Sequence, residues 1–178
     1  MKRARFAAVL VACFVGLVVS AMATAATSQG GAIRLIVSGG NQPKQKILVV
    51  GAIGDYGTAS SVDQNGKPDE NGNFEQIKLQ KGSFMVDATK FNAASNSVRP
   101  VIASPKNCSV LVSWHAPAAI VSGTRAYKGI SGSVNLQGTF AGVGPKFTSG
   151  PHKGQCNMKA EPKALQIAIT GSGKVKFS

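Results

Sequence analysis

The stretch Val121–Gly132, VSGTRAYKGISG, decides how the rest of the sequence is interpreted. Its three glycines, Gly123, Gly129 and Gly132, surround one aromatic residue, Tyr127. Glycine allows positive φ and close backbone approach without steric cost, and a glycine inside a strand pattern usually marks a bulge, a bend or a barrel corner. We therefore interpret this stretch as a structural glycine corner between two strands. An ordinary glycine-rich hairpin is the alternative.

Outside this stretch the apolar segments are short, and glycine-, proline- or asparagine-rich turns separate most of them. Many short β-branched segments at regular spacing predict a sandwich or a barrel. We expect residues 54–57 to break the chain, residues 60–73 to form a mobile polar loop, and residues 88–97 to favour a loop over one helical turn. The expected strands cover residues 32–38, 46–53, 74–79, 83–88, 108–116, 133–140, 165–169 and 174–177. The sequence thus predicts an all-β, single-domain antiparallel β-barrel, with a β-sandwich as the alternative.

The glycine stretch resembles the corner between two strands of the allene oxide cyclase and dirigent barrels, which carry a G-T-G-x-[FY]-x-G-x-x-G type pattern. Residues Gly123–Gly132 read GTRAYKGISG, with Arg125 at the place of the second glycine of that pattern. Two earlier segments, Gly51–Gly57 and Lys81–Asp87, fall in the order in which those barrels place comparable strands. The resemblance implies a barrel fold. It implies no catalytic residue, because the matching residues are structural.

Residues 1–25 have the order of a secretory signal peptide. A basic start is followed by the apolar run Phe6–Met22 and then by small residues that fit the A-x-A cleavage rule. We predict cleavage near Ala25, one β-barrel-like domain over residues 26–178, and a secreted or cell-surface location. A retained membrane anchor and lipidation at Cys13 are the alternatives.

The predicted mature chain is strongly basic. The full sequence has 20 Lys and Arg against 7 Asp and Glu, and cleavage would remove three basic residues, leaving a net charge of +10. Residues 88–178 hold eleven basic residues and one acid, Glu161. A basic C-terminal half of this kind can attract an anionic surface polymer. The alternative is that these cations only form a solvated surface and bind no partner. Aromatic residues make up only 6% of the chain, so no stacking platform for specific nucleic-acid binding is expected.

Two cysteines, Cys108 and Cys156, would remain after cleavage. An even number of cysteines in an exported chain predicts a disulfide, and two buried thiols are the alternative. A loop of about 48 residues closed in this way gains about 4 kcal/mol in the chain-entropy treatment. We expect the bridge to tie the loop after the glycine corner across the sheet and so to brace the corner.

Few residues offer chemistry, and we assign no catalytic, cofactor-binding or metal-ligating residue. The histidines are His115 and His152, and the disulfide would remove the thiol from any Cys–His pair. The oxygen-rich segment 63–75 departs from the calcium-loop pattern at required positions. Asp55 and Asp87 stand alone at strand ends, where turn or cap roles are commoner than a place at a barrel mouth.

These observations predict a secreted, non-catalytic β-barrel that acts as a binding or surface-interaction protein. The alternative is a barrel for a small apolar ligand, either a cyclase-like enzyme or a dirigent-like binding protein. A filled interior favours the first, and an open apolar cavity with convergent polar groups favours the second. No cofactor and no stable membrane span after cleavage are expected.

Overall fold

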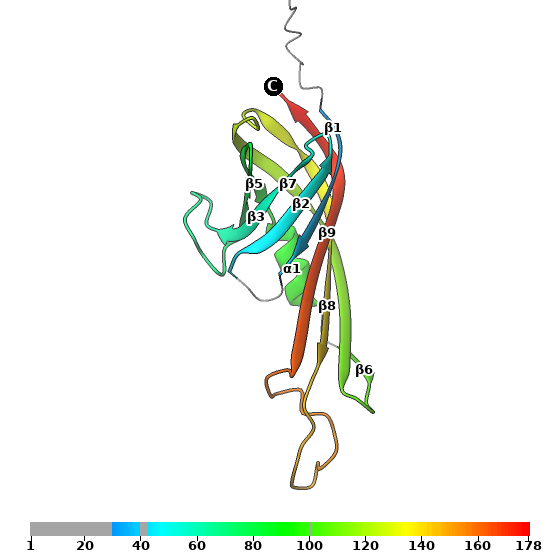
Figure 1. Ribbon diagram of the computed structural model, residues 1–178. Coiled ribbons are helices and arrows are strands. Elements are labelled where there is room, and N and C mark those ends of the chain that lie inside the picture. Colours follow the sequence, from blue (N-terminus) through cyan, green and yellow to red (C-terminus); the bar gives the residue numbers. More distant parts are fainter. Residues whose placement is uncertain (1–29, 40–42, 100) are drawn as a thin grey trace, which may run out of the picture.

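The computed structural model describes residues 30–39, 43–99 and 101–178, and the predicted signal peptide lies outside them. The chain forms a closed antiparallel barrel of eight strands, as predicted (Figure 1). The sheet order is β5-β4-β3-β2-β1-β9-β8-β7-β6, and pairing of β5 with β7 closes the barrel. In the part of the chain that the structure describes, no helix has the length and apolarity needed to cross a membrane. The elements are β1 (Gly31–Ser38), β2 (Gln45–Gly51), β3 (Asp55–Val62), β4 (Phe74–Leu79), β5 (Gly82–Asp87), α1 (Thr89–Ser97), β6 (Val101–Ser104), β7 (Ser109–Arg125), β8 (Ile130–Val143) and β9 (Ala164–Phe177).

Side chains fill the interior of the barrel. Alternate residues of a strand point to opposite faces, so in β1 the buried Ile33, Leu35 and Val37 point inward while Arg34 and Ile36 face outward. The same alternation continues around the sheet. The most deeply buried side chains include Val49, Phe84, Val134 and Val175, each at most 1% exposed. The barrel is thus a packed core rather than an open container.

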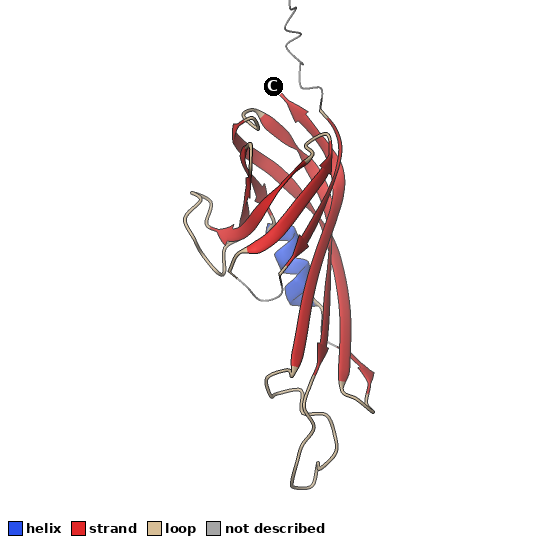
Figure 2. Cartoon of the chain, in the orientation of Figure 1, coloured by secondary structure: helices blue, strands red, loops and turns tan. Residues whose placement is uncertain are grey.

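Three strands are much longer than the others and leave the barrel. β7 has 17 residues and β8 and β9 have 14 each, whereas β1–β5 have six to eight. Their far parts, joined by β6, project from one end of the barrel as a curved ribbon that we call the arm (Figure 1). The loop over residues 144–163, which joins β8 to β9 at the end of the arm, is the tip. α1 lies beside the arm at the same end of the barrel (Figure 2).

Three predictions about strands were wrong. Asp55 and Tyr56 begin β3 instead of breaking the chain, residues 60–62 end β3 instead of opening a polar loop, and β9 is one continuous strand instead of two short strands around a glycine turn. The glycines of β9 serve close packing. A Cβ on Gly171 would lie 2.8 Å from a methyl of Leu136, and a Cβ on Gly173 would lie 2.0 Å from the carbonyl oxygen of Ser133. Neighbouring strands leave no space for a side chain at these two positions, so the glycines are required by packing and do not mark a turn.

The expectation of a loop over residues 88–97 was also wrong, because α1 forms there. The Asp87 carboxylate accepts hydrogen bonds from the Thr89 amide at 3.0 Å and from its hydroxyl at 2.6 Å at the start of the helix. Phe91 is buried against Trp114, with ring centroids 5.6 Å apart. This contact with β7 supports a short helix whose asparagines would favour a loop in isolation.

Candidate functional site

The glycine corner joins β7 to β8 at the barrel end opposite the arm (Figure 1). The pairing of β7 with β8 ends where Ile120 lies opposite Gly132, and residues 122–125 of β7 pair with β5. Arg125, which replaces the glycine of the family pattern, adopts a left-handed φ of 52°, and Gly129 has a φ of 74°. Gly123 and Gly132 allow close approach, since a Cβ on either would lie within 2.2 Å of a carbonyl oxygen. These glycines therefore sit where a side chain would collide with neighbouring backbone or would need a strained conformation.

Tyr127 points from this corner into the barrel and is 3% exposed. Its hydroxyl donates a 2.5 Å hydrogen bond to Asp55, which is 5% exposed at the start of β3. The same carboxylate accepts hydrogen bonds from the amides of Tyr56 at 2.8 Å and Lys81 at 3.0 Å. Asp55 thereby joins β3, the β4–β5 turn and the β7–β8 turn. We call this arrangement the Asp55–Tyr127 lock.

The ionisation of the lock follows from these contacts. Burial alone raises the pKa of Asp55, but the hydrogen bonds from Tyr127 and the two amides outweigh burial, so the pKa lies below its ordinary value. Burial and the neighbouring carboxylate both raise the pKa of Tyr127. A satisfied carboxylate beside a neutral phenol is suited to holding three segments together. Neither Asp55 nor Tyr127 lines either of the two hollows described below.

The structure does not place Asp55 and Asp87 at a common barrel mouth. Asp55 belongs to the lock, whereas Asp87 accepts hydrogen bonds from Thr89 at the start of α1. Sequence reasoning missed the pairing of Asp55 with Tyr127 because the two residues are 72 positions apart. Among the described residues, no group of three or more His, Cys, Asp or Glu is arranged to hold a metal ion.

An apolar groove lies between α1 and the inner face of the long strands, with a volume of about 310 Å³. Aromatic rings of Phe91, Trp114 and Phe140 line it, together with aliphatic and a few polar side chains. One of the polar groups, Asn92, already donates a hydrogen bond to the Gly72 carbonyl oxygen at 3.2 Å. The indole nitrogen of Trp114 is buried and has no hydrogen-bond partner among the described residues. The groove lies outside the packed lumen and has room for a small apolar molecule.

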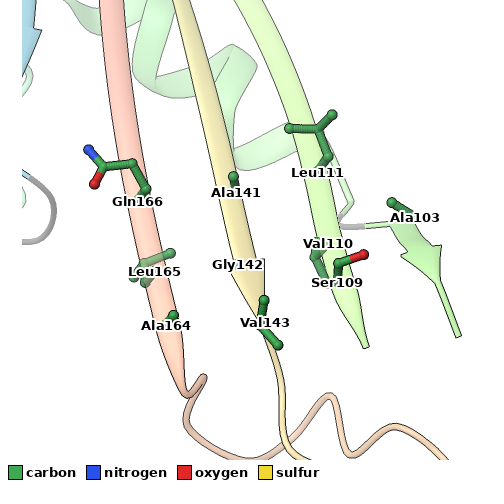
Figure 3. A pocket seen from close by; sticks show the side chains of 10 residues that line it. All are labelled: Ala103, Ser109, Val110, Leu111, Ala141, Gly142, Val143, Ala164, Leu165 and Gln166. Carbon is green, nitrogen blue, oxygen red and sulfur yellow. The ribbon is translucent and has the colours of Figure 1, made fainter. Parts of the chain in front are cut away.

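A second, wider hollow of about 530 Å³ lies on the arm (Figure 3). Most of its lining side chains are small or aliphatic, and Ser109 and Gln166 supply the polar ones. The Gln166 amide nitrogen donates to the neighbouring Ile167 carbonyl oxygen at 3.2 Å. No set of convergent polar groups marks this hollow as a reaction site among the described residues. Its lining residues are Ala103, Ser109, Val110, Leu111, Ala141, Gly142, Val143, Ala164, Leu165 and Gln166.

The predicted disulfide is present, and it braces the tip. Cys108 and Cys156 are bonded, with their Cα atoms 5.4 Å apart. The expectation that the bridge would support the glycine corner was wrong, because Cys108 precedes β7 at the end remote from that corner. The tip is also ordered by backbone hydrogen bonds, including a reciprocal pair of 2.9 Å between Phe147 and residues 154–155.

Exposed lysines gather around this braced tip. Five lysines lie in the tip or in the adjoining turn before β7, against one exposed acid, Glu161. His152 also lies here, beside the Phe147 ring and within 3.1 Å of the Gln155 side chain. By contrast, His115 stands exposed on β7. The five lysines are Lys106, Lys146, Lys153, Lys159 and Lys163.

In comparisons with protein-family models, with curated proteins and with solved structures, the chain matched none. The resemblance of the corner to allene oxide cyclase and dirigent barrels therefore stays a prediction, and the geometry of the chain itself has to carry the functional argument.

Proposed function

We propose that the protein is a secreted, non-catalytic binding protein that attaches to an anionic surface polymer through its tip. The observation that carries this proposal is the concentration of exposed lysines, four on the tip and Lys106 in the adjoining turn, that a disulfide between these two segments holds in place. Clustered cations attract a polyanion by releasing its condensed counterions, which makes binding strong at low salt and weak at high salt. A preformed loop loses less conformational entropy on binding than a free one.

The barrel supports this role by holding the arm. Its lumen is packed with side chains, and the Asp55–Tyr127 lock closes the end away from the tip. The long strands then carry the tip clear of the body, where a large polymer can reach it (Figure 1).

Export is part of the same proposal. A structural disulfide is typical of oxidising compartments, and residues 1–25 have the order of a signal peptide. The intact mass of the protein recovered from the medium of its host should correspond to cleavage near Ala25. Full-length chain in the membrane fraction would contradict export with cleavage.

Heparin-affinity chromatography tests tip binding. The triple variant Lys146→Gln/Lys153→Gln/Lys159→Gln should elute at clearly lower salt than the parent protein. The matched control, Lys81→Gln/Lys128→Gln/Lys176→Gln, removes the same charge from the opposite end and should elute close to the parent. Equal losses in both triples would mean that net charge alone drives retention, and retention unchanged by high salt would contradict a counterion-release mechanism.

The groove beside α1 favours a second candidate function, the binding of a small apolar ligand. Its volume of about 310 Å³ is at the lower end of the range for small-molecule sites, roughly 300–1,000 Å³. Trp114 is the only tryptophan in the chain, so its fluorescence reports on the groove. Native mass spectrometry of protein from its own host should show a retained small molecule, and adding an apolar dye to the emptied protein should shift the Trp114 emission. An unchanged emission with no retained mass would remove this candidate.

A further inference from the structure

The outward side of β9, β1, β2 and β3 carries a group of exposed apolar side chains that neither candidate function uses. We call this surface the barrel face. It includes Ile36, Leu48, Val50 and Tyr56, whose exposed fractions are 48%, 44%, 39% and 62%. In β2 only the inward residues Ile47 and Val49 are covered within the described chain.

Strand register shows that these four side chains form one patch. Ile36 is directly opposite Leu48, and Leu48 is directly opposite Tyr56, so a row runs across three neighbouring strands. Val50 follows Leu48 by two residues and therefore points to the same side. A contiguous apolar patch of this kind on a soluble surface marks a contact with a partner or a membrane more often than an isolated apolar residue does.

Basic side chains surround the patch. Arg34 lies directly opposite Val50, and Lys46 precedes Leu48 by two residues on the same face. Lys78 extends the basic rim on β4, opposite Thr58, and Lys174 extends it on β9, opposite Ala32. All four cations are exposed.

The barrel face also lacks negative charge. Within the four strands that form it, Asp55 is the one acidic residue, and it is buried in the lock. The face therefore combines an aliphatic and aromatic centre with a margin that carries four cations and, within these strands, no exposed acid.

We propose that the barrel face docks on the surface of an anionic lipid bilayer. The apolar row would enter the boundary between headgroups and acyl chains, where the tyrosine ring is favoured because one end is apolar and the other is wet. Lysine and arginine stems lie along the apolar surface while their charged ends reach lipid phosphates. Each cation near such a surface contributes about fivefold to partitioning. A second copy fits less well, because two basic margins would face one another.

Co-sedimentation with vesicles tests the proposal. The full mature protein should pellet with vesicles of phosphatidylcholine mixed with phosphatidylglycerol, and it should stay in solution with vesicles of pure phosphatidylcholine. Ile36→Ser/Leu48→Ser should lower the partition coefficient about tenfold, because it removes the inserted apolar surface. Lys46→Gln should lower it about fivefold.

The matched control is Leu111→Ser/Val121→Ser, which removes two outward side chains that are 55% and 47% exposed on β7. β7 is four strands away from β2 in either direction around the barrel, so this variant should partition like the parent protein. Circular dichroism and thermal melting should match for all variants, since every substituted residue is exposed.

Three results would overturn the proposal. The first is equal partitioning of the two double variants. The second is loss of vesicle binding in the tip triple variant but not in Ile36→Ser/Leu48→Ser, which would assign lipid contact to the tip. The third is a change in the solution mass of Ile36→Ser/Leu48→Ser from dimer to monomer without a change in vesicle binding, which would identify a contact between copies. Heparin retention is measured separately, so failure here leaves the tip proposal standing.

Discussion

At the scale of single residues, the lock and Glu75 show opposite uses of a buried carboxyl. Asp55 receives a hydroxyl and two amide hydrogen bonds, which favour its charged form. For Glu75, burial dominates and raises the pKa, and the 2.7 Å hydrogen bond from Ser61 offsets this only in part. At neutral pH the ionised form of Asp55 therefore stabilises the folded protein, whereas ionisation of Glu75 destabilises it.

Tyr127→Phe should lower the free energy of unfolding by about 2 kcal/mol, because it removes a hydrogen bond to a buried, charged group. The ring would still pack against Phe84, whose centroid is 5.9 Å away, so the fold should survive. Urea unfolding at neutral pH measures the change. Tyr56→Phe is the control, since that side chain is exposed on the outer face. Equal stabilities for Tyr127→Phe and the parent protein would show that the lock contributes nothing.

Glu75→Gln should stabilise the protein at neutral pH and lose that advantage in acid. Because the folded-state pKa of Glu75 is raised, its favourable contribution exists below the unfolded-state pKa and disappears as pH rises through the folded-state value. The pKa of Asp55 is lowered, so its contribution is present above the unfolded-state pKa and is lost as pH falls through the folded-state value. Thermal melts from acid to neutral pH check both signs. A variant that is less stable than the parent at neutral pH would contradict the assignment for Glu75.

At the scale of elements, the sequence predicted the strands whose alternation is strong, and most of the errors arose where tertiary packing decides. β1 could be predicted because its apolar residues Ile33, Leu35 and Val37 recur at the spacing of a strand. β3 was missed because its sequence is mostly polar, and its strand conformation depends on pairing with β2 and β4. In β9, glycines needed for close packing were taken for a turn, and α1 depends on its contact with β7.

The candidate sites likewise include features that the sequence predicts and features that depend on the assembled sheet. The bridge between Cys108 and Cys156 could be predicted from an even cysteine count after the expected signal-peptide cleavage. Its position at the tip could not, because nothing in the local sequence shows that β7–β9 outgrow the barrel. The patch around Leu48 depends on cross-strand register, which only the assembled sheet supplies.

Cys108→Ser/Cys156→Ser should lower the free energy of unfolding by about 2–4 kcal/mol and leave the barrel folded. The loss should be concentrated in the tip, so amide hydrogen exchange should quicken over residues 144–163 and change little in β1–β5. A thiol assay on the native parent protein should find no free cysteine. Two free thiols, or exchange that quickens evenly across the barrel, would contradict the structural account.

At the scale of the whole molecule, two surfaces point in different directions. The tip lies at the end of the arm, and the barrel face lies on the side formed by β9, β1, β2 and β3 (Figure 1). A protein that holds a polymer at its tip and a bilayer on its side would link the two. Adding soluble heparin to vesicle-bound protein should therefore recruit heparin to the pellet. If heparin instead released the protein from the vesicles, the two surfaces would be competing rather than bridging.

The antiparallel pairing of β1 with β9 gives the protein a direction of mechanical weakness. Gly31 is opposite Val175, so both described chain ends leave from one end of this pair. A force that pulls these ends apart opens the backbone hydrogen bonds one after another, as in a zipper. A force applied between Lys153 and the C-terminus instead pulls along β9, which is already extended and is paired with β8 and β1. In an optical trap, the second geometry should therefore rupture at the higher force.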